Sequence, residues 1–283
     1  MATDWTLQFN GITLGGATNP YQISSIVGLH ETPEIRTSDV NRARTHGQFA
    51  GIDYLGGRDI AATVEVRSPH PSNSIWQAFS QALVAGQTTE GQLLIQVPGL
   101  AAGATVRVNA RVRRLALPMD RSYSLGVGMA NVEWHCTDPR IYDNSLTTLS
   151  TTQASGSGTG LTLPITFPIT FGSGTSGGQV TATNQGEFNA PWTATINGPV
   201  TNPRIENITA GVTLSFVGSL ASGDSLTVSS LDRTILLNGT ASRYSWLTST
   251  SQWFDLSPGD SAIRFAGTSG SGSMTFNFRS VWI

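Results

Sequence analysis

Apolar and polar residues alternate in several stretches of the first half of the chain, which predicts β-strands with one buried face. The clearest stretches cover residues 58–67, 104–117 and 132–136. An Asn10-Gly11 pair separates two further alternating stretches, 5–9 and 12–14, and favours a tight hairpin turn. The residues expected to face inward in the three long strands are Ile60, Ala62, Val64, Val66, Val106, Val108, Ala110, Val112, Val132, Trp134 and Cys136.

One stretch has helical spacing instead. Its apolar residues recur every three or four positions and predict an amphipathic helix that lies across a sheet: Ile75, Trp76, Phe79, Leu83 and Val84. Ser72 or Asn73 is suited to cap its N-terminus, and Gly86 is suited to end it.

Residues 34–46 are more charged and less apolar than the strands on either side. Arg36, Arg42 and Arg44 lie close together there, and glycines follow at positions 47, 51, 56 and 57. This pattern predicts a long β-hairpin arm, residues 36–57, that leaves the body of the first domain.

The second half has a different organisation. The strand at 132–136 stops at Asp138-Pro139, where proline cannot donate to a β-ladder, so we place the exit from a first domain, 1–143, here. Residues 144–178 are rich in Ser, Thr and Gly and predict an irregular connector. Residues 179–283 contain short strands at close spacing with turn signals between them, which is typical of an antiparallel β-sandwich. The predicted fold class is therefore mainly β, with one helix.

Composition narrows the function classes. Charged residues make up only 12% of the 283 residues and the net charge is −2, so no basic footprint for nucleic acid or an anionic membrane is present. The only cysteine, Cys136, excludes an intramolecular disulfide, and its apolar strand favours a buried thiol over a nucleophile. No stretch resembles a signal peptide or a membrane span, so synthesis in a cytoplasm is expected.

Catalytic chemistry is not indicated, and we predict neither an enzyme nor a cofactor. The four histidines, at positions 30, 46, 70 and 135, lack metal-ligand spacing. Residues 174–178 match G-x-S-x-G, but the strand–turn–helix context of a nucleophile elbow is missing. Asp138 and Asp143 could be paired acids of a glycoside hydrolase, although turn residues beside Pro139 explain them better.

Aromatic residues of the second half are the one feature that resembles a binding site. Stacked on a β-sandwich they could form a sugar platform, whereas aromatics in a small sandwich are more often core. The candidates for carbohydrate contact are Trp192, Arg243, Tyr244, Trp246 and Trp253.

The order of several motifs resembles the distal tail protein family of long-tailed bacteriophages, also called siphovirus-type tail components. Gly56-Gly57-Arg58-Asp59-Ile60 precedes the strand to Arg67, and the helical stretch follows. Residues 134–142 end in the Asp-Pro-Arg-x-Tyr exit of the family's first domain. Further matches are Asn197-Gly198-Pro199, Pro203-Arg204-Ile205, Gly223-Asp224-Ser225-Leu226, Leu237-Asn238-Gly239 and the run 251–259. The resemblance extends from about residue 56 to the end, and the uncharged run 146–178 departs from it.

The resemblance implies a structural component of the phage tail tip in the virion. In that family the first domain forms a homohexameric belt ring, which joins the tail tube protein to the tail-tip hub, the tape measure protein and the fibres. The genome passes through the ring lumen without sequence-specific contacts. The second domain would be a galectin-like sandwich outside the ring, contacting the tip, the fibres or a host surface glycan.

A cyclic ring needs two different complementary patches on each subunit. We expect the arm to supply one of them, with Arg36, Arg42, Arg44 and Arg58 as inter-subunit contacts. The alternative function is a carbohydrate-binding β-sandwich protein that contacts the host cell surface.

Overall fold

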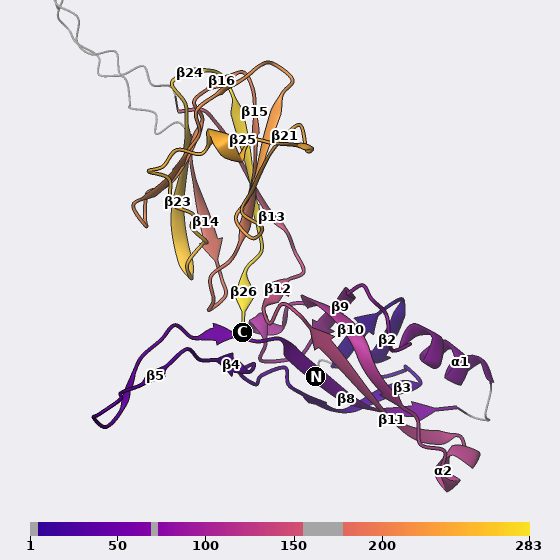
Figure 1. Ribbon diagram of the computed structural model, residues 1–283. Helices are drawn as coiled ribbons and strands as arrows, with labels where there is room; N and C mark the ends of the chain where they lie inside the picture. The colour runs from indigo at the N-terminus through magenta and orange to yellow at the C-terminus, as the bar shows by residue number, and fades with distance from the viewer. Residues whose placement is uncertain (1–4, 69–72, 155–177) are drawn as a thin grey trace, which may run out of the picture. The chain divides into compact units, whose positions relative to one another are not determined.

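A computed structural model describes residues 5–68, 73–154 and 178–283. The chain forms two compact units, Met1–Asn144 with Trp282–Ile283, and Ser145–Val281 (Figure 1). Both units consist mainly of antiparallel strands, which confirms the predicted mainly β fold class.

The first unit is built on a nine-stranded sheet whose central order is β2-β1-β9-β10-β11-β8-β3. Strand β12 pairs with β10 and with β26 (Val281–Trp282), and Trp282 packs against the core of this unit. The other bounds are β1 (Thr6–Phe9), β2 (Ile12–Gly15), β3 (Tyr21–Val27), β8 (Arg58–Arg67), β9 (Gly91–Gln96), β10 (Val106–Ala116), β11 (Val127–Cys136) and β12 (Ile141–Asp143).

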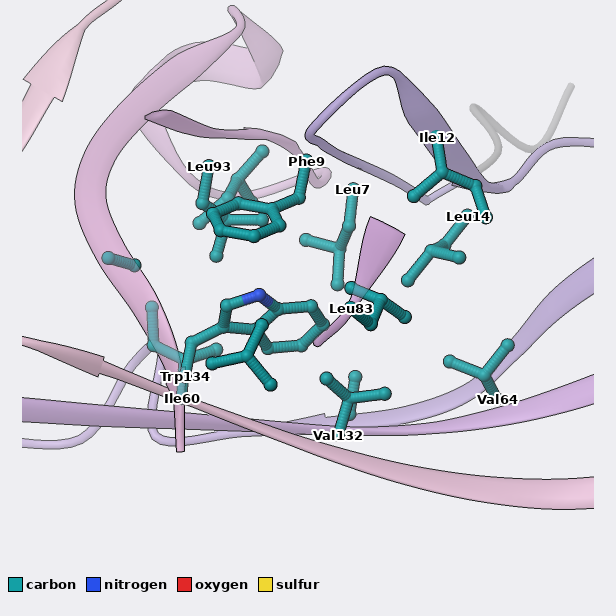
Figure 2. Close-up of a cluster of buried hydrophobic side chains, with 14 of the residues drawn as sticks. Leu7, Phe9, Ile12, Leu14, Ile60, Val64, Leu83, Leu93, Val132 and Trp134 are labelled. Atoms are coloured by element: carbon teal, nitrogen blue, oxygen red, sulfur yellow. The ribbon is translucent and has the colours of Figure 1, made fainter. Parts of the chain in front are cut away.

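Strand β10 belongs to both halves of this sheet. Its first part, up to Ala110, pairs with β9, whereas its second part, from Arg111, pairs with β11 across an irregularity between Val112 and Arg114. Side chains from the two halves meet in one core, where Figure 2 shows Phe9 and Leu93 facing Trp134 and Ile60. The unit is therefore sandwich-like.

The predicted strands have the predicted buried faces. All eleven inward residues named from the alternation are at most 3% exposed. The Asn10-Gly11 turn is confirmed as well, because φ is 45° at Asn10 and 81° at Gly11 and Phe9 pairs with Ile12. Burial of alternate β-branched and aromatic residues thus defines the core of the first unit.

Helix α1 (Asn73–Ala82) lies where the helical spacing predicts it. Trp76, Phe79 and Leu83 are buried, and the Tyr21 ring lies 5.3 Å from that of Phe79. Val84 is 49% exposed, because the helix ends at Ala82 and residue 84 no longer follows the helical stripe. Ser72, one of the two proposed capping residues, lies outside the described residues.

A short helix, α2 (Arg121–Ser124), connects β10 to β11. The side chain of Asp120 caps it by accepting a 3.0 Å hydrogen bond from the Tyr123 amide. Tyr123 also packs against Trp76 of α1, with ring centroids 4.9 Å apart. A single 3-10 turn, η1 (Ala101–Gly103), precedes β10.

The predicted arm is present between β3 and β8. Strand β4 (Ile35–Arg36) pairs with β7 (Tyr54–Leu55), and β5 (Val40–Asn41) pairs with β6 (Gln48–Phe49). Both ladders are antiparallel, so residues 35–55 form one long hairpin, which Figure 1 shows extending from the first unit.

The second unit has a six-stranded sheet, a four-stranded sheet and a small three-stranded sheet. The six-stranded sheet contains β13 (Thr147–Thr152), β25 (Ser273–Phe278), β15 (Trp192–Asn197), β20 (Ser225–Ser229), β21 (Thr234–Leu237) and β22 (Ala241–Ser242). The four-stranded sheet contains β14 (Gln179–Asn184), β23 (Gly259–Ala266), β17 (Arg204–Asn207) and β18 (Val212–Ser215). The small sheet contains β19 (Ser219–Leu220), β16 (Val200–Thr201) and β24 (Ser269–Gly270).

The proposed connector 144–178 needs a correction at its beginning. Thr147–Thr152 forms β13 and pairs along its whole length with β25, from Thr147 opposite Phe278 to Thr152 opposite Ser273. A run of β-branched threonines is well suited to an edge strand, although its lack of apolar alternation conceals this in the sequence. Residues 155–177 of the proposed connector lie outside the described residues.

Candidate functional site

The arm carries a set of exposed apolar side chains. Val40 and Phe49 are directly opposite each other in the β5–β6 ladder and are 62% and 60% exposed. Ile35, Ile52 and Tyr54 are also about half exposed or more. A two-stranded hairpin is marginally stable alone, and clustered exposed apolar groups are typical of interaction surfaces. The arm therefore has the character of a segment that is completed by a partner.

The sequence pattern missed these apolar residues, because single hydrophobic positions between charged ones do not form a regular alternation. The available signal was the symmetric placement of Val40 and Phe49 about the glycine-containing tip. Only the cross-strand register shows that they share one face.

Three of the four candidate arginines lie on the arm. The Arg42 guanidinium is 4.8 Å from the centroid of the Phe49 ring, a cation–π arrangement. Arg36 is opposite Tyr54 in the β4–β7 ladder, and both Arg36 and Arg44 are exposed. The arm thus combines cationic and apolar groups on one hairpin.

Arg58 has a different environment, which corrects its assignment to an exposed inter-subunit surface. The side chain is 1% exposed. Its Nη1 donates to the carbonyl oxygens of Gly28, Leu29 and Glu31 at 2.8–3.0 Å. Its Nε donates to the Pro139 carbonyl at 2.9 Å. Burial lowers the pKa of Arg58, while the neighbouring Cys136 and Glu31 act in the opposite direction.

The first unit also has incompletely paired strands. In the sheet of described residues, β3 has a strand neighbour only at β8. Residues 112–116 of β10 pair with β11, whereas the ladder of β10 with β9 ends at Ala110. Such edges present backbone donors and acceptors to which another chain can add a strand.

The proposed sugar platform is only partly assembled. Trp192 is 2% exposed, lies 4.9 Å from the Phe276 ring and donates through Nε1 to the Phe254 carbonyl at 2.8 Å. Trp192 is therefore a core residue of the second unit. The prediction that it contacts carbohydrate is wrong, because its ring is not accessible to a ligand. The inward face of β15 receives it, as alternation along a strand requires.

Arg243, Tyr244 and Trp246 do lie together, at the 3-10 turn η2 (Tyr244–Trp246). The Arg243 guanidinium is 5.7 Å from the Trp246 ring centroid, and Tyr244 is 51% exposed. The Gly218 backbone lies close against the Trp246 ring. Trp253 is half-buried, and its buried indole nitrogen has no hydrogen-bond partner in the part of the chain that the structure describes.

No acid–base constellation is evident in the described residues. A search of 5–68, 73–154 and 178–283 finds no group of three metal-ligating side chains. Asp138 is engaged in its own turn, where it accepts from the Arg140 amide at 3.1 Å and from the Tyr142 hydroxyl at 2.5 Å. Burial raises the pKa of the Cys136 thiol to about 12, which keeps it protonated and unreactive. No described helix is long and apolar enough to cross a membrane.

The known proteins to which this chain is similar, in sequence or in fold, are components of phage tails. Residues 185–282 match the family described as siphovirus-type tail component, C-terminal domain. No curated protein matches the sequence. Among solved structures, the Dit protein of phage SPP1 is similar over 99% of both chains, with 12% identity and a TM-score of 0.65. Its crystal structure is described as a paradigm of the hub adsorption apparatus in phages that infect Gram-positive bacteria.

Two structures of the phage P2 baseplate in its activated conformation, with Ca and with Sr, are similar at 9% identity. Their TM-scores are 0.49 and 0.47, with coverage of 99% and 98% of this chain and 98% and 97% of theirs. At 12% identity, the likeness to SPP1 Dit establishes the fold over the full length. The chain therefore has the fold of SPP1 Dit, and its residues 185–282 are similar to the C-terminal domain of siphovirus-type tail components.

Proposed function

We propose that this protein is a structural component of a siphovirus tail tip and forms a homo-oligomeric ring through its first unit. The observation that carries the proposal is the exposed apolar arm, in a chain with the full-length fold of SPP1 Dit. The role is architectural: the chain supplies surfaces that tile around an axis, and it catalyses no reaction.

Two kinds of surface support a closed ring. The arm offers apolar and cationic groups, and the edges at β3 and residues 112–116 of β10 offer backbone hydrogen bonds. These surfaces differ from one another, as a heterologous, cyclic contact requires. We propose a hexamer that connects the tail tube protein to the hub, the tape measure protein and the fibres.

A second candidate function concerns the second unit. The cluster of Arg243, Tyr244 and Trp246, in which Tyr244 is 51% exposed and the other two are half-buried, favours contact with the tip, the fibres or a host surface glycan. Saturable binding of the purified protein to cell-wall glycan, lost in Tyr244→Ala and retained in Ile208→Ala (45% exposed), would support the glycan among these ligands.

The ring is tested with the purified full-length protein by negative-stain electron microscopy and light scattering. We expect sixfold rings for the parent, and loss of rings when Val40 and Phe49 are both replaced by serine. The matched control is Val217→Ser, which alters an equally exposed valine (63%) of the second unit. Intact rings after deletion of residues 42–51 would exclude the arm as a ring contact.

A further inference from the structure

The two ends of the arm come together at one place in the first unit, which we call the arm root (residues 28–34 and 56–58). The chain enters the arm after β3 and returns through Gly56 and Gly57 to β8. One backbone hydrogen bond joins the two sides, from the Gly56 amide to the Glu34 carbonyl at 2.6 Å.

Arg58 connects these two sides with its side chain. It stands on the returning side, and its Nη1 donates to three carbonyls of the entering side, those of Gly28, Leu29 and Glu31. Its Nε reaches Pro139 in the turn that follows β11. One guanidinium thus joins three segments that are distant in the sequence.

The chemistry of these contacts is specific to arginine. All four acceptors are backbone carbonyl oxygens from separate residues, and the planar guanidinium presents several donors in a fixed fork. The buried Nη2 has no hydrogen-bond partner, and no ion pair joins Arg58 to a carboxylate among the described residues. Burying a charged group costs free energy. A buried guanidinium at this position therefore indicates that its directional hydrogen bonds are needed here.

The backbone around Arg58 is packed too closely for side chains at two glycines. A Cβ atom on Gly28, where φ is +85°, would lie 2.0 Å from the Asp59 carbonyl oxygen. A Cβ atom on Gly57 would lie 2.8 Å from His135 Cε1 and 2.9 Å from the Cys136 carbonyl oxygen. The arm root therefore lies directly against the β8–β11 pair, while the arm beyond it is exposed.

We propose that Arg58 is the positioning residue of the arm, which holds both sides of the root to the Pro139 turn so that the hairpin leaves the first unit in a fixed direction. A fixed direction lowers the entropic cost of ordering the arm when it meets a neighbouring subunit. The value of this contact for assembly rests on the proposed ring function, whereas the fixed direction is a property of the single chain.

The direction is measured as a distance distribution between spin labels at Arg44→Cys, near the arm tip, and Gln8→Cys, on β1. The native Cys136 is buried and stays unlabelled. The doubly labelled chain is mixed with an excess of unlabelled chain, so that the measured distances lie within one chain. We expect one narrow distribution in the parent and in Arg121→Gln, the matched control at an exposed arginine of α2, and a broad distribution in Arg58→Gln.

Hydrogen exchange at the Gly56 amide provides the second measurement. Loss of a charge-assisted hydrogen bond network should accelerate exchange there by about tenfold to a hundredfold, with exchange in β1 and β9 unchanged. If Arg58→Gln does not fold, Arg58→Lys replaces it, and an intermediate broadening is expected because one ammonium cannot reach all four carbonyls. A distribution as narrow as the parent's in a folded Arg58 variant would overturn the proposal. Absence of rings in the parent would count against the ring alone.

Discussion

The indole of Trp134 and the phenyl ring of Phe9 meet edge to face in the first unit, with centroids 6.3 Å apart and planes inclined by 69°. The two residues come from opposite halves of the sheet that share β10, and both are at most 1% exposed (Figure 2). This contact joins the two halves of the core. Among the described residues the Nε1 of Trp134 has no hydrogen-bond partner, so the ring contributes through packing alone.

Replacement of Trp134 should therefore test the core directly. We expect Trp134→Ala to lower the free energy of unfolding of the first unit by about 3–5 kcal/mol, because a large cavity remains. Trp134→Phe should cost less, since it keeps an aromatic ring and removes an unpaired N–H. Native-state hydrogen exchange in β1 and β11 measures both, with the exposed Trp5→Ala as control. Equal costs for the two Trp134 variants would contradict the packing argument.

Cys136 should be inert to thiol reagents in the folded protein. Its thiol pKa is raised to about 12 by burial, so almost no thiolate exists at pH 8. At pH values below about 8.5, the pKa of the thiol in the unfolded chain, the thiol is neutral in both states. Its burial then contributes fully to the free energy of unfolding. As the pH rises from there towards about 12, the unfolded thiol ionises first and stability is lost. The check is maleimide labelling against urea concentration, where reaction of the native protein at pH 8 would disprove the assignment.

Trp192 and Tyr244 should behave in opposite ways. Trp192→Ala is expected to destabilise the second unit by about 3–5 kcal/mol, because its ring is buried between Phe254 and Phe276. Tyr244→Ala should change stability by less than about 0.5 kcal/mol, since its side chain is exposed. Hydrogen exchange in the strands of the second unit, measured as the temperature is raised, distinguishes the two variants. A stable, folded Trp192→Ala protein would reinstate Trp192 as a candidate surface residue.

Gly128 on β11 lies under the Trp76 ring of α1. A Cβ atom at this position would approach Trp76 Cη2 to 2.4 Å. We expect Gly128→Ala to displace the helix and to destabilise it by about 1–3 kcal/mol, the usual cost of overpacking. Hydrogen exchange of the α1 amides measures this destabilisation. Gly16→Ala cannot serve as a control, because the φ of +88° at Gly16 would strain any side chain there. Trp76→Leu combined with Gly128→Ala should recover part of the loss, and no recovery would place the strain elsewhere.

The sequence alone determined the local structure of this protein to a large extent. Alternation with period two fixed the inward faces of β8, β10 and β11, because a strand turns successive side chains to opposite sides. The Asn10-Gly11 pair determined a hairpin, and the helical spacing determined α1, because these signals act within a few residues. The ordered motifs also carried the family resemblance.

Only the tertiary structure decided which chemical groups are buried and which are presented. Arg58 looked like one of several arm arginines, yet a surrounding cage of four backbone carbonyls buries it. Trp192 resembled the exposed aromatics, yet the Phe254 and Phe276 rings pack against it and it is 2% exposed. Thr147–Thr152 became a strand because β25 offers it an edge. In each case the decisive partner is far away in the sequence, and burial is a property of the partners that the fold brings together.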